Sequence, residues 1–253
     1  MAAIIANSTA LKAVVSSSAA MSAVAASQTA MAAIASSQTA MAAIFRSSTA
    51  LQVVQNNASA WAIFSNASSA VMGKTVAELA GLNPSGYADM NAIASSSTAR
   101  AAIEKSQVAK DAIAASDMAT AKYAVGAAGL KPADYANMAA VAASQTAMAA
   151  IAASSTALSA IAASTTALDA IYAKKKRMSG ARASLSGKFI ILQISDGNAF
   201  DTSQYGYATL SDGSKPNWGS YKAKYAYFKQ YKKIATYMKN DTDSDDWIDY
   251  FQC

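Results

Sequence analysis

A ten-residue repeat occupies most of residues 1–172 and constrains the fold more than any other feature of the chain. Consecutive units read MSAVAASQTA from Met21, MAAIASSQTA from Met31 and MAAIFRSSTA from Met41, and the pattern returns from Met138 onward. The apolar side of one unit is too small to form a core alone, so units must stack on their neighbours. The repeat therefore predicts a quasi-linear architecture for about two thirds of the chain.

The apolar positions of the unit lie three residues apart and identify the expected core. Position one is Met or Leu and position four is Ile or Val, which places both on one face of a helix. Ser, Thr, Gln or Asn predominate at positions six to nine, and a hydroxyl residue before an apolar run is typical of a helix N-cap. The predicted repeat core includes Met31, Ile34, Met41, Ile44, Met148, Ile151, Leu158 and Ile161.

Three architectures are compatible with this pattern: an α-solenoid of short helices, a long coiled-coil shaft and a β-solenoid. Ten residues over three turns give about 3.3 residues per turn, tighter than the roughly 3.5 of a coiled coil. The apolar stripe of one straight helix would slip by about 80° per unit. Serine pairs cap helices better than they extend them, and alanine and methionine disfavour strands. We therefore predict the α-solenoid, with helices of about six or seven residues, and keep the coiled-coil shaft as the alternative.

Two related insertions, at 71–89 and 120–137, interrupt the repeat. They contain the segments AGLNPSGYADMNAIA and AGLKPADYANMAAVA. Their glycines, Gly81 and Gly129, predict helix ends, because glycine readily adopts the left-handed conformation that follows a helix. A proline three residues after each glycine suits the first turn of the next helix. We interpret the insertions as wider loops in the shaft, with contact sites for another subunit as the alternative.

Composition excludes several classes of site. The chain has no histidine, which is the commonest general acid–base group and metal ligand, and its one cysteine is Cys253. Five of the 21 basic residues lie between Lys174 and Arg182, and we interpret 173–183 as a solvated basic linker. Nucleic-acid binding is not expected, because the run lacks interleaved aromatic residues. We expect no cofactor, and no membrane span, because eighteen uninterrupted apolar residues occur nowhere.

Residues 184–253 predict a small antiparallel β domain. Alanine becomes rarer after Arg182, while aromatic and aspartate residues become more frequent. Apolar or alternating runs separated by Gly and Asp turn signals predict about five strands. These runs lie at 188–195, 205–210, 221–229, 234–238 and 247–251. The expected fold class is α+β, with an N-terminal α-solenoid followed by this small sheet.

Aromatic residues in the β domain are candidate binding residues. Tyrosine and tryptophan offer a rigid apolar surface with a polar tip, which suits sugars and protein surfaces. Filling of the small core is the competing explanation for many of them. Those in or beside predicted loops are Tyr205, Tyr207, Trp218 and Tyr221.

An acidic turn in the same domain is a second candidate site. Asp241, Asp243 and Asp245 alternate along the chain and could supply oxygen ligands to calcium. The glycine and the distal glutamate of an EF-hand loop are missing from the segment. We therefore favour a solvated hairpin tip over a metal site. The same aspartates could supply a carboxylate pair for glycoside cleavage, but nothing in the sequence places them across a cleft, so we do not expect an enzyme.

The segments SSQTAMAAI, SSTALSAI and SQTAMAAV resemble the Ala/Ser/Thr-rich repeats of bacteriophage tail fibres and other virion fibre proteins. A repetitive shaft followed by GKFIILQIS is also similar to phage fibres that end in a small β domain. The resemblance implies a structural virion protein, assembled in the host cytoplasm, whose repetitive spacer presents the β domain for host-surface attachment. The alternative is a capsid or tail decoration protein that binds only other virion proteins.

The same resemblance suggests the partners of the chain. They would be other virion proteins and a glycan or protein of the host surface, together with further copies of the chain itself. A trimer is compatible with a fibre, although no residue in the sequence specifies it.

Overall fold

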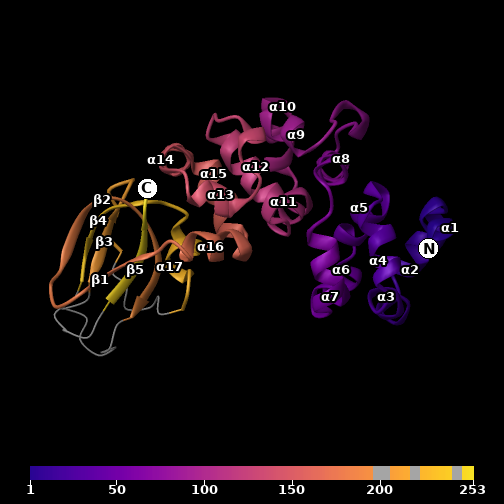
Figure 1. Cartoon of the computed structure of the whole chain (residues 1–253), viewed down its shortest axis with the longest axis horizontal. Coiled ribbons are helices and arrows are strands. Elements are labelled where there is room, and N and C mark those ends of the chain that lie inside the picture. The colour runs from indigo at the N-terminus through magenta and orange to yellow at the C-terminus, as the bar shows by residue number, and fades with distance from the viewer. Residues whose placement is uncertain (196–205, 217–222, 241–246) are drawn as a thin grey trace. The chain divides into compact units, whose positions relative to one another are not determined.

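The computed structural model describes residues 1–195, 206–216, 223–240 and 247–253, and these form two compact units. Unit 1 comprises residues 1–127 and 131–137, and unit 2 comprises residues 128–130 and 138–253. The fold class is α+β, as predicted: many short helices precede a small antiparallel sheet (Figure 1). The last repeat helices belong to the same unit as the sheet.

Unit 1 is a succession of short helices. The longest helix in the described part of the chain has eleven residues, so the coiled-coil shaft and the β-solenoid are both wrong. The helices are α1 (Ala2–Ala6), α2 (Ser8–Val15), α3 (Ser18–Ala25), α4 (Gln28–Ala35), α5 (Gln38–Arg46), α6 (Ser48–Asn56), α7 (Ala58–Ser65), α8 (Ser69–Leu79), η1 (Pro84–Gly86), α9 (Met90–Ser95), α10 (Ser97–Lys105), α11 (Gln107–Ala114), α12 (Asp117–Ala127) and η2 (Pro132–Asp134).

A single extended residue produces each sharp bend between helices. Ser47 ends α5 and begins α6 with φ −108° and ψ 106°, and its hydroxyl accepts the N–H of Ala50 at 3.2 Å. This N-cap bond stabilises a new helix in a new direction immediately after the old one ends. Ser27 caps α4 in the same way, and the axes of α3 and α4 differ by 99°. Most repeat helices have eight or nine residues, slightly more than predicted, because the break needs only one or two residues.

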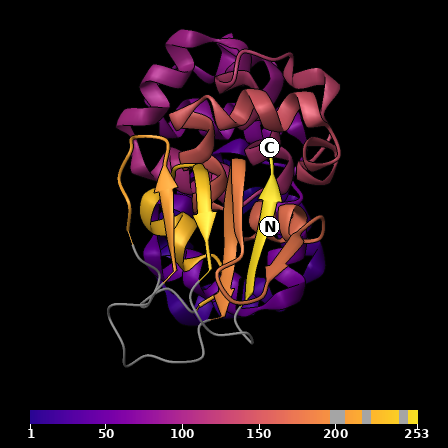
Figure 2. The same ribbon diagram turned by 90° about the vertical axis from the view of Figure 1, so that its left-hand side faces the viewer.

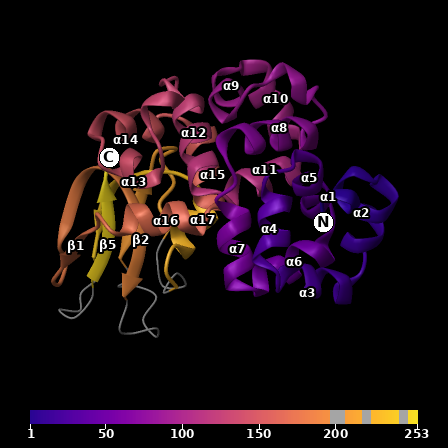
Figure 3. The same ribbon diagram turned by 45° about the vertical axis from the view of Figure 1, so that its right-hand side comes forward.

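In unit 1, helices that are three places apart in the chain pack on one another. Helix α2 packs on α5, α3 on α6, α4 on α7 and α5 on α8, as Figure 3 shows for α4 and α7. Bends of about 100° bring the chain back over itself after three helices, or about thirty residues. Predicted core residues Met31, Ile34, Met41 and Ile44 are buried between these turns.

The two insertions keep their helices in this stack while adding loops. Gly81 and Gly129 have φ of 75° and 79°, which places both in the left-handed region expected at a helix end. The prolines begin the short 3₁₀ helices η1 and η2. Within unit 1, the buried ammonium of Lys122 donates to Asn91 Oδ1 at 2.7 Å and to the carbonyl of Pro132 at 3.3 Å. This lysine ties the second insertion to the helix that follows the first.

Unit 2 continues the repeat and ends in the sheet. The strand order is β1-β5-β2-β4-β3 with every pair antiparallel, and Figure 2 views this sheet face on. Helix α13 packs on α16, again three helices apart. The elements are α13 (Met138–Ala142), α14 (Gln145–Ala152), α15 (Ser155–Ala163), α16 (Thr165–Tyr172), β1 (Lys176–Ser179), β2 (Ser184–Ser195), β3 (Tyr207–Leu210), α17 (Ala226–Tyr231), β4 (Ala235–Lys239) and β5 (Trp247–Gln252). Here too the predicted repeat core residues are buried: Met148, Ile151, Leu158 and Ile161.

Two sequence predictions about unit 2 are wrong. The predicted linker 173–183 contains β1, an edge strand that pairs with β5. The run predicted as a strand at 221–229 instead leads into helix α17, because residues on both sides of the helix leave extended geometry. Tyr225 and Lys232 both adopt left-handed backbone angles, with φ of 66° and 52°. Tyr225 and Tyr227, the described tyrosines of this run, therefore do not lie on one face of a strand.

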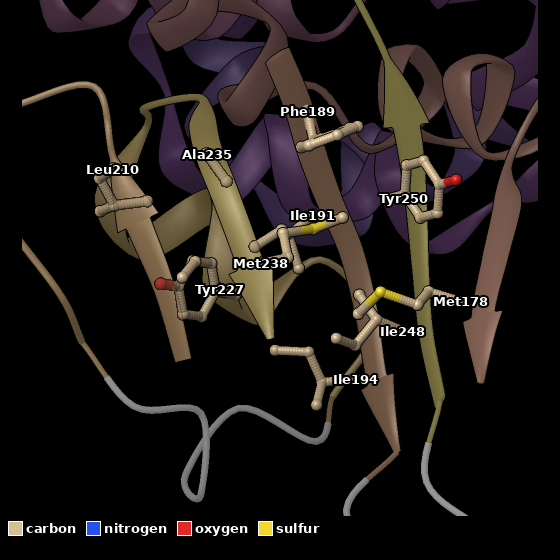
Figure 4. Close-up of a cluster of buried hydrophobic side chains, with 11 residues drawn as sticks. Met178, Phe189, Ile191, Ile194, Leu210, Tyr227, Ala235, Met238, Ile248 and Tyr250 are labelled. Atoms are coloured by element: carbon tan, nitrogen blue, oxygen red, sulfur yellow. The ribbon is translucent and has the colours of Figure 1, made fainter. Parts of the chain in front are cut away.

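The sheet has two different faces. Side chains alternate along a strand, so Ile248 and Tyr250 of β5 point to one face while Asp249 and Phe251 point to the other. The first face carries an apolar cluster with contributions from four other strands and α17 (Figure 4). The second face carries the polar groups that contact α16. Members of the apolar cluster are Met178, Phe189, Ile191, Ile194, Ala208, Leu210, Tyr227, Ala235, Met238, Ile248 and Tyr250.

Candidate functional site

Most of the sequence-predicted site residues lie outside the described residues. Among the candidate aromatics these are Tyr205, Trp218 and Tyr221, and the whole candidate calcium set, Asp241, Asp243 and Asp245, lies outside as well.

Tyr207 is the one candidate aromatic that the structure places. It lies in β3, is half-buried, and packs its ring 5.9 Å from the ring of Tyr237 on β4. This residue therefore contributes to a cross-strand pair in the sheet. In the described ranges, no group of three or more His, Cys, Asp or Glu side chains is arranged to hold a metal ion.

A buried carboxylate, Asp249, organises the sheet face that meets α16. Arg177 on β1, Asp249 on β5 and Gln193 on β2 are register partners across three neighbouring strands. The Arg177 guanidinium donates through Nε at 2.6 Å and through Nη2 at 2.9 Å to the two oxygens of Asp249, whose side chain is 0% exposed. The hydroxyl of Tyr172, the last residue of α16, donates to Asp249 at 2.9 Å. Burial and this hydrogen bond raise the pKa of Tyr172.

A second polar group lies beside the first. Asp169 on α16 accepts the hydroxyl of Tyr225 at 2.6 Å and the ammonium of Lys224 at 2.9 Å. The hydrogen bond from Tyr225, assisted by Lys224, holds the pKa of Asp169 below its usual range. Burial and Asp169 in turn raise the pKa of Tyr225. The rings of Tyr172 and Tyr225 meet edge to face at 5.9 Å, with the Lys224 ammonium 4.1 Å from the Tyr172 ring centre.

These two polar groups hold α16 on the sheet and are poorly suited to acid–base catalysis. Both oxygens of Asp249 already accept charge-assisted or hydroxyl hydrogen bonds, and Arg177 also stacks 3.7 Å over the ring of Trp247. A bidentate arginine fixes the geometry of the carboxylate and occupies both of its oxygens. The arrangement therefore anchors the last repeat helix and sets the position of the basic segment that follows it.

The basic segment lines a cavity of about 380 Å³ in unit 2. We call this cavity the Lys174 pocket. Its lining residues are Gln145, Lys174, Lys176, Phe251 and Gln252. They come from α14, from the start of β1 with the turn before it, and from the end of β5. The Lys176 ammonium donates to Gln252 Oε1 at 2.7 Å, so its charge has a neutral partner here. No acidic side chain lines the pocket.

The lining of the Lys174 pocket defines the chemistry it can accept. Two ammonium groups attract an anionic group, two carboxamides can exchange hydrogen bonds, and Phe251, which is only 5% exposed, contributes a small apolar part of the lining. The volume lies within the range of small-molecule sites, which begins at about 300 Å³. The pocket is therefore suited to a small polar ring that carries a carboxylate or phosphate.

The basic run at 174–177 is evident in the sequence, but its pattern predicts a solvated linker and gives no indication of a pocket. The missing information was long-range: Gln145 and Gln252 are separated from the lysines by many residues and reach them only through the docking of α16 on β5. The alternation expected of a strand was also hard to recognise here. Four charged residues in a row, 174–177, precede Met178, which is the one buried position of β1.

No family model matches the chain, and a search of curated proteins likewise finds no match. Within the described ranges, no single helix is long and apolar enough to cross a membrane, whereas two sharply bent pairs, α3 with α4 and α14 with α15, pass that test only when joined.

Proposed function

We propose that this chain is a non-enzymatic component of a bacteriophage virion, in which the repeat is a spacer and unit 2 attaches to the host surface. The repeat supports the spacer role, because its units consist of Ala, Ser, Thr and small apolar residues and use their hydroxyls as helix caps. Each superhelical turn advances the structure by one helix diameter, or about 8–10 Å. Reach therefore grows with the number of units and requires no chemically reactive group.

The Lys174 pocket is the observation that supports attachment. Its two lysines, two glutamines and one phenylalanine suit an acidic sugar, which combines a ring, hydroxyls and a negative charge. An exposed two-lysine site binds weakly by itself, since surface charge pairs contribute only about 0–1 kcal/mol each. Several copies on one virion would convert weak contacts into firm attachment through avidity.

Binding of the full chain to an array of bacterial surface polysaccharides tests this proposal. We expect binding to glycans that carry carboxylate or phosphate groups, and weaker binding in high salt because exposed charges are screened. Lys174→Glu should abolish the signal. Lys215→Glu, which makes the same charge change at an exposed lysine of unit 2 outside the pocket, should retain it.

Three outcomes would contradict the proposal. Equal loss in both variants would show that net charge, rather than the pocket, controls binding. Absence of glycan binding by the folded chain would favour the alternative, a capsid or tail decoration protein whose partners are only other virion proteins. Release of reducing sugar from a bound polysaccharide would make the chain an enzyme.

A further inference from the structure

Lys122 is the one buried lysine in the described part of the chain, and its direct partners carry no charge. The residue lies on α12 and is only 7% exposed. Its ammonium donates to Asn91 Oδ1 at 2.7 Å and to the carbonyls of Pro132 and Tyr135 at 3.3 and 3.4 Å. A buried charge is usually paired with an opposite charge, because its removal from water is costly. A buried ammonium held by neutral oxygens is therefore an unusual feature of unit 1.

A carboxyl group holds the other end of the same Asn91 amide. Asn91 Nδ2 donates to Asp89 Oδ2 at 2.7 Å, so the amide lies between an amine and an acid. The second Asp89 oxygen accepts the N–H of Ala92 at 2.9 Å and caps α9, which fixes the carboxyl group in place. All of these residues belong to unit 1. We call Lys122, Asn91 and Asp89 the Lys122 triad.

The Lys122 amine lies within reach of the amide carbon of Asn91. A carbonyl bond is about 1.23 Å long, so Nζ at 2.7 Å from Oδ1 is less than about 4 Å from Cγ. Attack on a carbonyl starts from a separation of about 3–3.5 Å, which a small rotation of the lysine side chain would give. Because the fold holds both groups in position, the reaction requires no encounter between separate molecules.

We propose that Lys122 and Asn91 form an isopeptide bond within the chain, with Asp89 as the catalytic acid and base. Nζ attacks Cγ, an N–C bond forms, and the bond between Cγ and Nδ2 breaks. Nζ keeps one of its three protons, and the other two end on the departing nitrogen. The Asp89 carboxyl group relays them, since it is hydrogen-bonded to that nitrogen. The products are a secondary amide and an ammonium ion, so atoms, charge and electrons balance without an oxidant or reductant.

The duplicated segments of the chain provide an internal comparison. Aligning the two insertions on their glycines makes Lys74 the equivalent of Lys122 and Ala139 the equivalent of Asn91. Lys74 is exposed, whereas Lys122 is buried against the asparagine that follows the first insertion. The bond would connect α12 covalently to α9. It would also restrict the unfolded chain between residues 91 and 122, as a disulfide does.

Mass spectrometry of the intact folded chain tests this bond. Loss of ammonia should lower the mass of the 25.9 kDa chain by about 17 Da. Trypsin does not cut after an acylated lysine, so a digest should contain residues 75–100 bound to a peptide that includes Lys122. A mass that stays at the value for the unmodified sequence after prolonged incubation of the folded chain would overturn the proposal.

Asp89→Asn separates the chemistry from the fold. Asparagine is as good an N-cap as aspartate, so α9 should keep its cap while the proton relay is lost. A general acid–base group contributes about 10²–10⁴-fold, so the bond should form at least about a hundredfold more slowly in this variant. Lys74→Met is the matched control, because it removes an exposed lysine at the equivalent position and should leave the bond in place.

Lys122→Met distinguishes the isopeptide bond from another reaction that releases ammonia. An asparagine side chain can also lose ammonia by closing on its own backbone, which gives the same mass change without a branched peptide. A mass loss that persists in Lys122→Met would identify that reaction and contradict the proposal. Equal rates of bond formation in the parent chain and in Asp89→Asn would overturn the catalytic role of Asp89.

Discussion

Replacing Gly126 by alanine should damage unit 1 through a clash between two helix backbones. A Cβ atom added at Gly126 on α12 would lie 2.3 Å from the carbonyl oxygen of Ala94 and 2.8 Å from its carbonyl carbon. Carbonyl atoms of a helix cannot rotate away as the end of a flexible side chain can. Helix α9, which carries Ala94, also cannot retreat, because a Cβ at Gly73 on α8 would lie only 2.3 Å from the backbone of Asp89 at its other end.

The magnitude follows from two opposing contributions. Alanine favours a helix interior over glycine by about 1 kcal/mol. Overpacking of a well-filled contact costs about 1–3 kcal/mol, and occasionally more. Because the clashing atoms are backbone on both sides, we take the upper end of that range. The net loss of unfolding free energy should be about 2 kcal/mol.

Urea denaturation followed by circular dichroism at 222 nm measures this loss. Gly86→Ala is the control, because a Cβ there meets no atom within 4 Å and its φ lies outside the left-handed region. The control should be neutral or slightly stabilising, since alanine restricts the unfolded chain. If Gly126→Ala unfolds within 0.5 kcal/mol of the parent chain, the close approach of α9 and α12 is not a real constraint.

Three further predictions concern hydrogen bonds and titration. Ser47→Ala should cost about 1–2 kcal/mol in urea denaturation, because the hydroxyl both caps α6 and donates to the carbonyl of Val15 in the previous turn at 2.7 Å. Arg177→Met should cost about 3 kcal/mol, because it leaves the buried Asp249 carboxylate without its cationic partner and with only the Tyr172 hydroxyl as a side-chain donor, and replacing Asp249 by leucine as well should recover much of that loss. The lowered pKa of Asp169 means that its contribution is complete above the unfolded value near 4 and is lost as pH falls through the folded value. The stability difference between the parent chain and Asp169→Asn should therefore shrink on acidification below about pH 4, and a constant difference would contradict this assignment.

The solenoid could be predicted from the sequence because its information is local. A cap serine such as Ser37 or Ser47 recurs every ten residues and fixes both where a helix begins and where the previous one ends. The apolar positions Met41 and Ile44 then follow at fixed distances from the cap. No long-range contact is needed to identify these features, and the repetition presents the same signal many times.

The sheet was predicted less well because its signals are not local. The run that ends in α17 alternates tyrosines as a strand would, but the left-handed conformation of Tyr225 and the contact of its N–H with the Leu192 carbonyl at 2.6 Å redirect the chain. The strand β1 is short and highly charged, and it exists because β5 lies beside it. Edge strands are commonly charged, which protects them from pairing with further strands. The same charges make such strands hard to predict from the sequence.

The three-helix period also explains how the repeat tolerates its insertions. Contacts between α5 and α8, α8 and α11, and α9 and α12 all join helices three apart, although the first insertion loop lies between α8 and α9. The chain leaves the stack in this loop and re-enters it in the same direction. The loop therefore does not change which helices pack on each other. The loop does change the spacing between helices. Gly73 on α8 and Gly126 on α12 allow the backbone of α9 to lie close to both of these helices. The insertions are therefore expected to depend on those two glycines more strongly than on the length of their loops, because the stack constrains helix contacts and leaves the loops between them unconstrained.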